Sequence, residues 1–149
     1  VKTLNTSSHY VLVKLDVKEY LMSGTHDVLV QQNSKLFVGA ELYRYRDALK
    51  CVLEDQFAST SSSSPIFQVT CGSGMGVSCS GEVSDASLYF LAEHDMLADT
   101  HFRFHCGLRA HFSFNDDVFA VLGDPRKDVD AVKIQLSASS CPFVVDVET

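Results

Sequence analysis

Residues 100–114, THFRFHCGLRAHFSF, decide the predicted fold because their polarity alternates along the whole stretch. The even-numbered positions are apolar or small: Phe102, Phe104, Cys106, Leu108, Ala110, Phe112 and Phe114. A period of two is typical of a strand with one buried and one solvated face, since successive side chains point to opposite sides. We therefore predict a central core strand. A straight run of this length would span roughly 40 Å or more, so a bulge at Gly107 or a nearby hairpin is expected.

The outward positions of this predicted strand carry basic or titratable side chains. They are His101, Arg103, His105, Arg109 and His111. They predict a binding surface for an anionic or acidic partner that gains charge below pH ~6.5, and a solvated face that balances acidic neighbours is the alternative. A metal site is not predicted, because His101 and His105 would lie about 13 Å apart on a strand, and zinc–nitrogen bonds are only ~2.1 Å long.

The rest of the chain also favours strands. In HYVLVKLDVKEY, residues 9–20, Val13 and Leu15 fall on one face and Lys14 and Asp16 on the other, which is typical of a half-buried strand. Further strands are predicted at residues 26–30, 36–45, 66–71, 85–90 and 131–138. Residues 47–57 fit a helix or a strand, and the β-rich flanks favour a strand. The predicted fold is therefore all-β, an immunoglobulin-like antiparallel sandwich with a single domain over residues 1–149.

Composition limits the classes of function. The chain has 149 residues, 46% of them hydrophobic, and a net charge of −7. An acidic balance argues against a general nucleic-acid or anionic-membrane binder, because both need cationic surface. No apolar run approaches the roughly 18 residues that a membrane-spanning helix needs. A discriminating, soluble protein-binding domain is expected.

Cysteine usage and one sequon bear on the compartment. The five cysteines are Cys51, Cys71, Cys79, Cys106 and Cys141. They form no C-x-x-C pair, which disfavours a zinc site. Asn5 begins the glycosylation sequon Asn-Thr-Ser. Together these features favour an oxidising, extracellular setting, in which an odd cysteine stays free or pairs outside the chain.

Few other residues indicate chemistry. Glu93, Asp95 and Asp99 could supply oxygen ligands to calcium, although their spacing is not that of an EF-hand. The glycine-rich residues 72–76 lack the spacing of nucleotide-binding loops and predict a flexible loop. No catalytic motif is recognisable, so we predict a non-enzymatic protein without cofactors.

Four segments resemble the C-terminal subdomain of the zona pellucida module, an extracellular immunoglobulin-like sandwich. They are TLNTSSHYVLVKLDVKEY, KLFVGAELYRY, ALKCVLEDQFAST and FRFHCGL, within residues 3–112. Two family cysteines are missing, since Gln56 and His111 stand in their places. The resemblance implies a matrix, receptor or self-assembly role through protein contacts, with no cofactor.

The resemblance also implies disulfides and a second contact surface. The candidate disulfide cysteines are Cys51, Cys71, Cys79 and Cys106, with pairs such as Cys51–Cys106 or Cys71–Cys79 left open. The second candidate surface is the run Tyr43, Arg44, Tyr45 and Arg46, because tyrosine and arginine are enriched at binding hot spots. The two tyrosines could instead belong to the core.

Two other functions stay open. The order of strands also resembles an intracellular lipid-binding sandwich of tensin type, in which the basic strand would face phosphoinositides and the thiols would stay reduced. A secreted viral or host decoy sandwich that binds a protein ligand is the third possibility.

Overall fold

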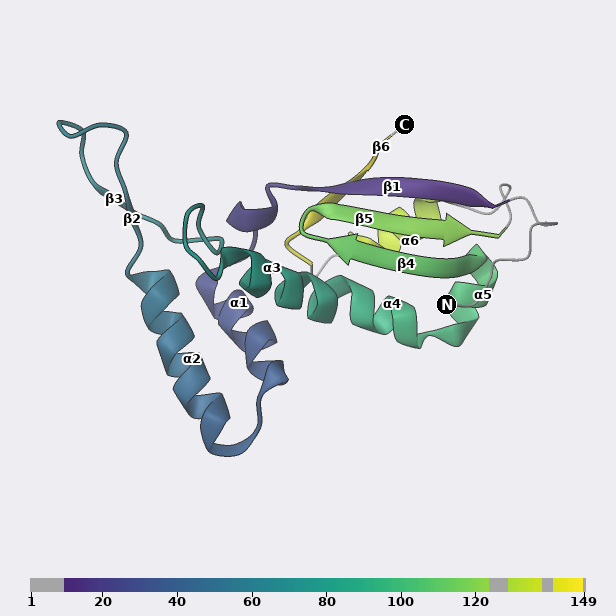
Figure 1. Ribbon diagram of the computed structural model, residues 1–149, viewed down its shortest axis with the longest axis horizontal. Helices are drawn as coiled ribbons and strands as arrows, with labels where there is room; N and C mark the ends of the chain where they lie inside the picture. The colour runs from purple at the N-terminus through teal and green to yellow at the C-terminus, as the bar shows by residue number, and fades with distance from the viewer. Residues whose placement is uncertain (1–9, 124–128, 138–140, 149) are drawn as a thin grey trace. The chain divides into compact units, whose positions relative to one another are not determined.

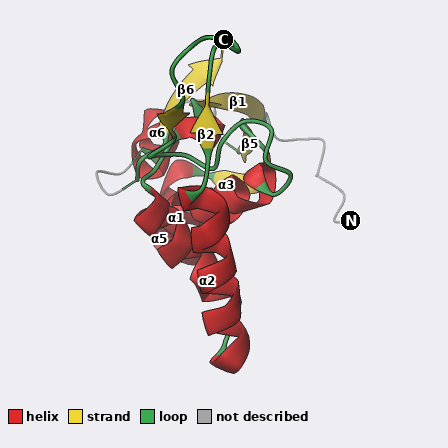
Figure 2. Ribbon diagram, turned by 90° about the vertical axis from the view of Figure 1, so that its left-hand side faces the viewer, coloured by secondary structure: helices red, strands yellow, loops and turns green. Residues whose placement is uncertain are grey.

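The computed structural model describes residues 10–123, 129–137 and 141–148 (Figure 1). The chain forms two compact units, and the first joins residues 1–18 to residues 92–149. The second consists of residues 19–91. The all-β prediction is wrong, because the fold is mixed α/β and half of it is helical, as the red ribbons in Figure 2 show.

The first unit is built on one antiparallel sheet with the strand order β4-β5-β1-β6. Its elements are β1 (Val11–Lys18), α4 (His94–Ala98), α5 (Thr100–Cys106), β4 (Leu108–Phe114), β5 (Asp117–Leu122), α6 (Val129–Leu136) and β6 (Val144–Glu148). Residues 19–91 are therefore an insertion between β1 and the helices α4 and α5. With α4 and α5 counted together, the unit without that insertion has the β-α-β-β-α-β element order of the ferredoxin-like motif.

One face of this sheet is buried. On β1, Val13, Leu15 and Val17 point inward, as the sequence pattern predicts. The inward residues of β5 and β6 pair with them in register, among them Val118 opposite Leu15 and Val145 opposite Val17. Met96, Cys106, Val132 and Leu136 of the helices are also buried. The unit's core thus lies between one face of the sheet and its helices.

The decisive stretch, residues 100–114, is half helix and half strand. Asp99 caps α5 by accepting a hydrogen bond from the backbone N–H of Phe102 at 2.9 Å. Gly107 ends α5 with φ 67°, a left-handed conformation that glycine adopts at little cost. Phe104, which was expected in the core, is consequently 80% exposed on α5.

A bulge then reverses the faces of β4. Leu108 pairs with the buried Leu122, but the register shifts between Leu108 and Ala110. Beyond the bulge His111 points inward, opposite Ala120, and Phe112 points outward, opposite Phe119. Because side chains alternate along a strand, one extra residue turns every later side chain to the other face. The strand predicted for residues 100–114 is therefore present only from Leu108 to Phe114, and it lies at an edge of the sheet, not at its centre. The inward face predicted for Phe112 and Phe114 is wrong.

The second unit is mainly helical. Its elements are the 3-10 turn η1 (Tyr20–Met22), α1 (His26–Asn33), the 3-10 turn η2 (Ser34–Leu36), α2 (Gly39–Glu54), the short hairpin β2 (Phe57–Ala58) and β3 (Phe67–Gln68), and α3 (Ser80–Leu88). A π-helical turn, η3 (Tyr89–Glu93), follows α3. Four of the predicted strands are therefore wrong, because residues 26–30, 36–45 and 85–90, and residues 131–138 in the first unit, are largely helical.

The core of the second unit comes from three helices. Leu29 and Val30 of α1 pack with Leu49 and Leu53 of α2 and with Val83 of α3. Leu49 and Leu53 are four residues apart, which places them on one side of a helix. For residues 47–57 the helical spacing was thus the correct pattern up to Glu54, and the strand that we favoured is wrong.

A buried asparagine joins the same three helices. Asn33 is fully buried, and its Nδ2 donates to the carbonyl of Val83 and to Ser87 Oγ, both at 2.9 Å. Its Oδ1 accepts from the hydroxyl of Tyr45 at 3.3 Å. Since an unpaired buried amide is costly, these bonds specify how the helices pack.

Candidate functional site

The outward face of the sheet carries apolar side chains, several of them large, that no described element of the first unit covers. We call this surface the open sheet face and define it by residues from β1, β4 and β5: Leu12, Ala110, Phe112, Phe114, Phe119 and Val121. Leu12 is 66%, Phe112 62% and Phe114 74% exposed. Antiparallel sheets often have one solvated face, but that face is normally polar.

The apolar residues of the open sheet face are contiguous. Phe112 lies directly opposite Phe119, and Ala110 lies opposite Val121. Val121 is in turn opposite Leu12 on the next strand. Single exposed apolar residues are ordinary, whereas a connected patch indicates a contact surface.

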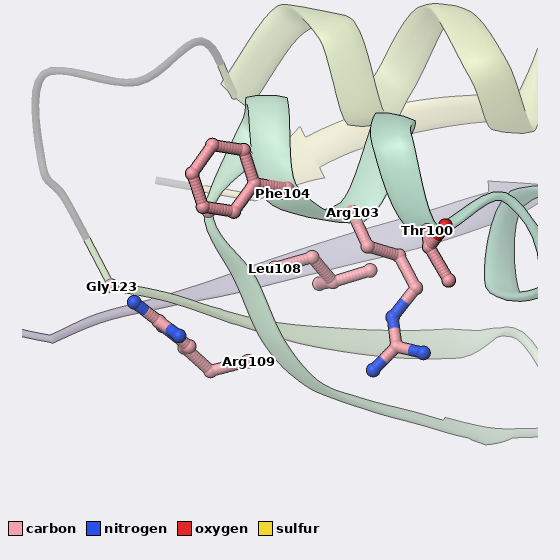
Figure 3. A pocket seen from close by; sticks show the side chains of 7 residues that line it. Thr100, Arg103, Phe104, Leu108, Arg109 and Gly123 are labelled. Atoms are coloured by element: carbon pink, nitrogen blue, oxygen red, sulfur yellow. The ribbon is translucent and has the colours of Figure 1, made fainter.

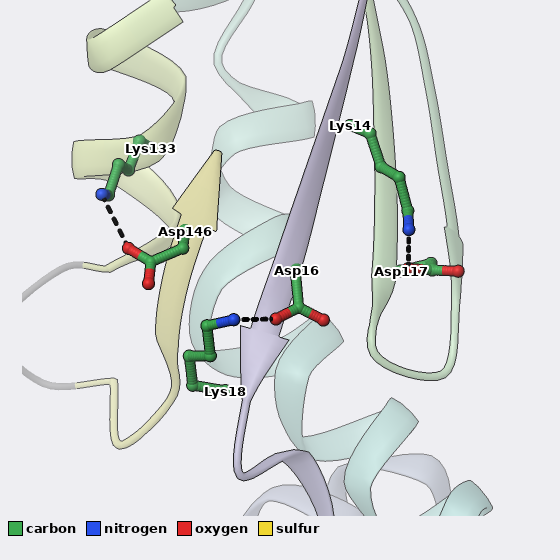
Figure 4. A network of polar contacts seen from close by, with 6 residues as sticks. All are labelled: Lys14, Asp16, Lys18, Asp117, Lys133 and Asp146. Atoms are coloured by element: carbon green, nitrogen blue, oxygen red, sulfur yellow. Dashed lines mark hydrogen bonds and ion pairs between the residues drawn. The ribbon is translucent and has the colours of Figure 1, made fainter. Parts of the chain in front are cut away.

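The other half of the same face is charged, and its charges are paired. Lys14 lies 3.0 Å from Asp117, and Lys18 lies 2.5 Å from Asp16 (Figure 4). At the β6 edge, Lys133 of α6 donates to Asp146 at 3.0 Å, and this hydrogen bond lowers the pKa of the Asp146 carboxyl. The open sheet face therefore presents both signs of charge beside an aromatic patch.

Two of the predicted binding residues line one pocket. Arg103 and Arg109 surround a recess of about 510 Å³ together with Thr100, Phe104, Gly107, Leu108 and Gly123 (Figure 3). Neither guanidinium has an ion pair or hydrogen bond within the described residues. Figure 3 shows the two side chains pointing to different sides of the recess, with Arg109 directed towards Gly123.

The three predicted histidines are separated by the change from helix to strand. His101 and His105 are exposed on α5, and their rings stack with centroids 6.4 Å apart. The separation of about 13 Å that argued against a metal applies to a strand, so it does not hold on this helix. His111 is instead turned inward beneath the sheet.

The inward His111 faces a buried carboxylate. Its Nε2 lies 3.4 Å from Oε1 of Glu93, and both side chains are almost completely buried. Burial lowers the pKa of the His111 imidazole, so the ring is neutral at neutral pH. His111 is therefore a core residue and does not belong to a basic outer surface.

The candidate calcium ligands do not converge. Glu93 is buried against β4, where it accepts from Ser113 Oγ at 3.3 Å. Asp95 lies 2.9 Å from His94, and Asp99 caps α5. In the described parts of the chain, no three histidine, cysteine or acidic side chains form a group that could hold a metal ion.

The Tyr43–Arg46 run lies on α2, where its members have different environments. Tyr43 is 58% exposed, with the guanidinium of Arg46 over its ring at 5.4 Å. Tyr45 packs instead on Phe37 at a ring distance of 4.2 Å, and burial raises the pKa of its phenol. Arg44 is exposed. The helix thus separates Tyr45, a packing residue, from the other three.

The predicted disulfides are not formed. None of the five cysteines is in a disulfide, and Cys51 and Cys71 are exposed as thiols. Cys51 Sγ lies 3.5 Å from Oδ2 of Asp55, and this hydrogen bond raises the pKa of the thiol. Disulfides therefore no longer support an extracellular location, which stays a prediction. The glycosylation sequon at Asn5 lies outside the described residues.

Comparison with family models, with curated proteins and with solved structures found no match to this chain. The zona pellucida resemblance therefore stays a prediction, and the immunoglobulin-like sandwich that it implied is not the fold observed. No helix in the described residues is both long enough and apolar enough to span a bilayer.

The sequence pattern did not identify the open sheet face. Phe112 and Phe114 were assigned to the core, and the strand partners of Phe119 could not be known. The available signal was Leu12, an apolar residue on the otherwise charged side of a strand that was correctly predicted.

Proposed function

We propose that this chain is a non-enzymatic assembly module that binds a second copy of itself through the open sheet face. The observation that carries the proposal is the contiguous apolar patch in which the exposed Phe112 and Phe114 adjoin the half-buried Phe119, on a sheet whose other face is already packed. Burying such a patch is favourable, at roughly 25 cal/mol for each Å² of apolar surface removed from water.

The charges favour a second copy over an unlike partner. In a two-fold interface the same surface is present on both sides, so it must complement itself. The open sheet face meets this condition, because apolar residues can pack on apolar ones while lysines and aspartates exchange partners. Lys14, Asp117, Lys18 and Asp16 contribute two charges of each sign.

Exposed aromatic residues on a four-stranded sheet are also the means by which some domains stack single-stranded RNA bases. Such binding needs free cations for the phosphates. Here Lys14 and Lys18 are each paired with an aspartate, and the chain carries a net charge of −7. These charges favour a protein partner.

Sedimentation velocity of the full chain over a concentration series tests the proposal. We expect a concentration-dependent dimer, and we expect the double variant Phe112→Ser, Phe114→Ser to be monomeric with an unchanged far-UV circular dichroism spectrum. Phe104→Ser is the matched control, since it removes an equally exposed phenylalanine from α5. A wild-type chain that stays monomeric throughout, or a double variant that dimerises like the wild type, would contradict the proposal.

A further inference from the structure

His101 and His105 form a pair whose geometry suits a shared ligand. They occupy positions i and i+4 of α5, and residues at this spacing are neighbours on a helix surface. Their rings are nearly parallel, at 6° and a centroid distance of 6.4 Å, and both are exposed. Within the described residues neither imidazole forms a hydrogen bond or an ion pair.

The observed separation is close to that of two imidazoles on one metal ion. Zinc–nitrogen bonds are about 2.0–2.1 Å, which places each ring centroid about 3.2 Å from the ion. Two rings at a tetrahedral angle then have centroids about 5.2 Å apart. The rings of His101 and His105 must therefore approach by roughly 1 Å and turn out of their parallel stack, so that one nitrogen lone pair of each points at the same ion. Side-chain rotation at an exposed site allows both changes. Zinc helices of the H-E-x-x-H type use the same i, i+4 histidine spacing.

We propose that His101 and His105 form a two-ligand, solvent-open site for a late first-row divalent metal ion such as Zn²⁺, Ni²⁺ or Cu²⁺. Imidazole nitrogen suits these ions, whereas Ca²⁺ and Mg²⁺ prefer oxygen. The remaining coordination positions are open to water. Affinity should follow the general order for nitrogen ligands, with Cu²⁺ bound most tightly.

The proposal does not depend on self-association, because both histidines lie on α5 and neither belongs to the open sheet face. Metal binding links two successive turns of α5, so the ion should stabilise the folded chain. Ligands that bind only the native state raise the unfolding temperature with concentration.

Isothermal titration of the full chain with Ni²⁺ tests the site. The exposed thiols of Cys51 and Cys71 also bind metals, so every protein in the series carries Cys51→Ser and Cys71→Ser. We expect one ion per chain, and a loss of affinity of at least about tenfold in His101→Ala and in His105→Ala. His94→Ala, which removes an exposed histidine of α4, should bind like the parent.

A variant with an unchanged number of histidines separates chelation from general histidine binding. Arg103→His combined with His105→Ala puts two histidines at i and i+2, which do not face each other on a helix. We expect this variant to bind as weakly as His105→Ala while its circular dichroism spectrum stays that of the parent. Binding within twofold of the parent by either this variant or His105→Ala would overturn the proposal.

Discussion

The two faces of the sheet in the first unit are both rich in apolar residues, yet only one of them is buried. Leu15 of β1 is fully buried, whereas Leu12 of the same strand is 66% exposed. On β5, Ala120 is buried on the inner face, and the next residue, Phe119, points to the outer face. There Phe119 lies opposite Phe112 of β4, which is 62% exposed. The difference lies in the helices: side chains of α4, α5 and α6 join the core on the inner face, and no described element of this unit covers the outer one.

This comparison shows that hydrophobicity alone does not identify a core. A residue contributes to the stability of the monomer only when other residues remove it from water. Apolar side chains on the outer face stay in contact with water and can be covered by another molecule. We therefore assign assembly to that face. Paired substitutions on the two faces should show this difference directly.

The largest effect is expected when a charge replaces each leucine of β1. Leu15→Asp should leave the first unit unfolded, because an unpaired buried carboxylate costs more than about 4 kcal/mol. Leu12→Asp should change the free energy of unfolding by only about 0.5 kcal/mol. Urea unfolding followed by circular dichroism, at protein concentrations below the dimer dissociation constant, measures both. Equal losses in the two variants would show that the faces are wrongly assigned.

The next largest effect on stability is expected when apolar side chains of β5 are shortened to alanine. Leu122→Ala should destabilise the chain by about 2–5 kcal/mol, since it leaves a cavity in a packed core. The neighbouring Val121→Ala, on the open sheet face, should cost less than about 1 kcal/mol. Urea midpoints of the two variants make the comparison, and a Val121 effect as large as that of Leu122 would mean that the outer face is covered within the monomer.

The next prediction concerns how the free energy of unfolding depends on pH through His111, which lies on the inner face. Burial lowers the pKa of His111 in the folded chain, so the unfolded chain takes up a proton first as the pH falls. The free energy of unfolding should therefore be greatest above pH ~6.5 and decrease below it, by at most about 1.4 kcal/mol per pH unit from this group. Glu93, at 3.4 Å, is the ionisable group that faces the ring.

The control for this prediction is a histidine that is not buried. Urea unfolding of His111→Leu at several pH values should lose the histidine-dependent part of the slope, whereas His94→Ala should keep it. If His111→Leu kept the full slope, another group would be responsible for the pH dependence.

The smallest effect is expected from the outer ion pairs. Lys14 and Asp117 are each about one-third exposed, and surface pairs of this kind contribute about 0–1 kcal/mol. Lys14→Ala should therefore change monomer stability by less than about 1 kcal/mol, and added salt should reduce even that difference. Thermal unfolding at low and high salt provides the measurement, and a loss comparable to that of Leu122→Ala would contradict it.

Some of the fold could be predicted from local pattern. The alternation in β1 was sufficient because its buried face, with Val13, Leu15 and Val17, follows one period without interruption. The turn between β4 and β5 contains Asn115, whose φ of 53° is a conformation that asparagine tolerates. In the same way, Leu49 and Leu53 carried the correct helical spacing, although the neighbouring predicted strands outweighed it.

The candidate site was less predictable. A helix as short as α5 spans only two turns, so alternating residues did not distinguish it from a strand. The helix signals were nevertheless present, with Asp99 at the beginning and Gly107 at the end. The reversal of Phe112 and Phe114 had no local signal, because the position of a bulge depends on the register of the neighbouring strand.

The sequence by itself determined the buried side of β1 and the acidic balance of the chain, since the first depends on residues close together and the second on composition. Only the tertiary structure decided that His111 is buried and that Phe112 joins Phe119 on an open face. These outcomes depend on pairing between distant segments. The free energy of burial is gained only when those segments come together, so no local pattern contains it.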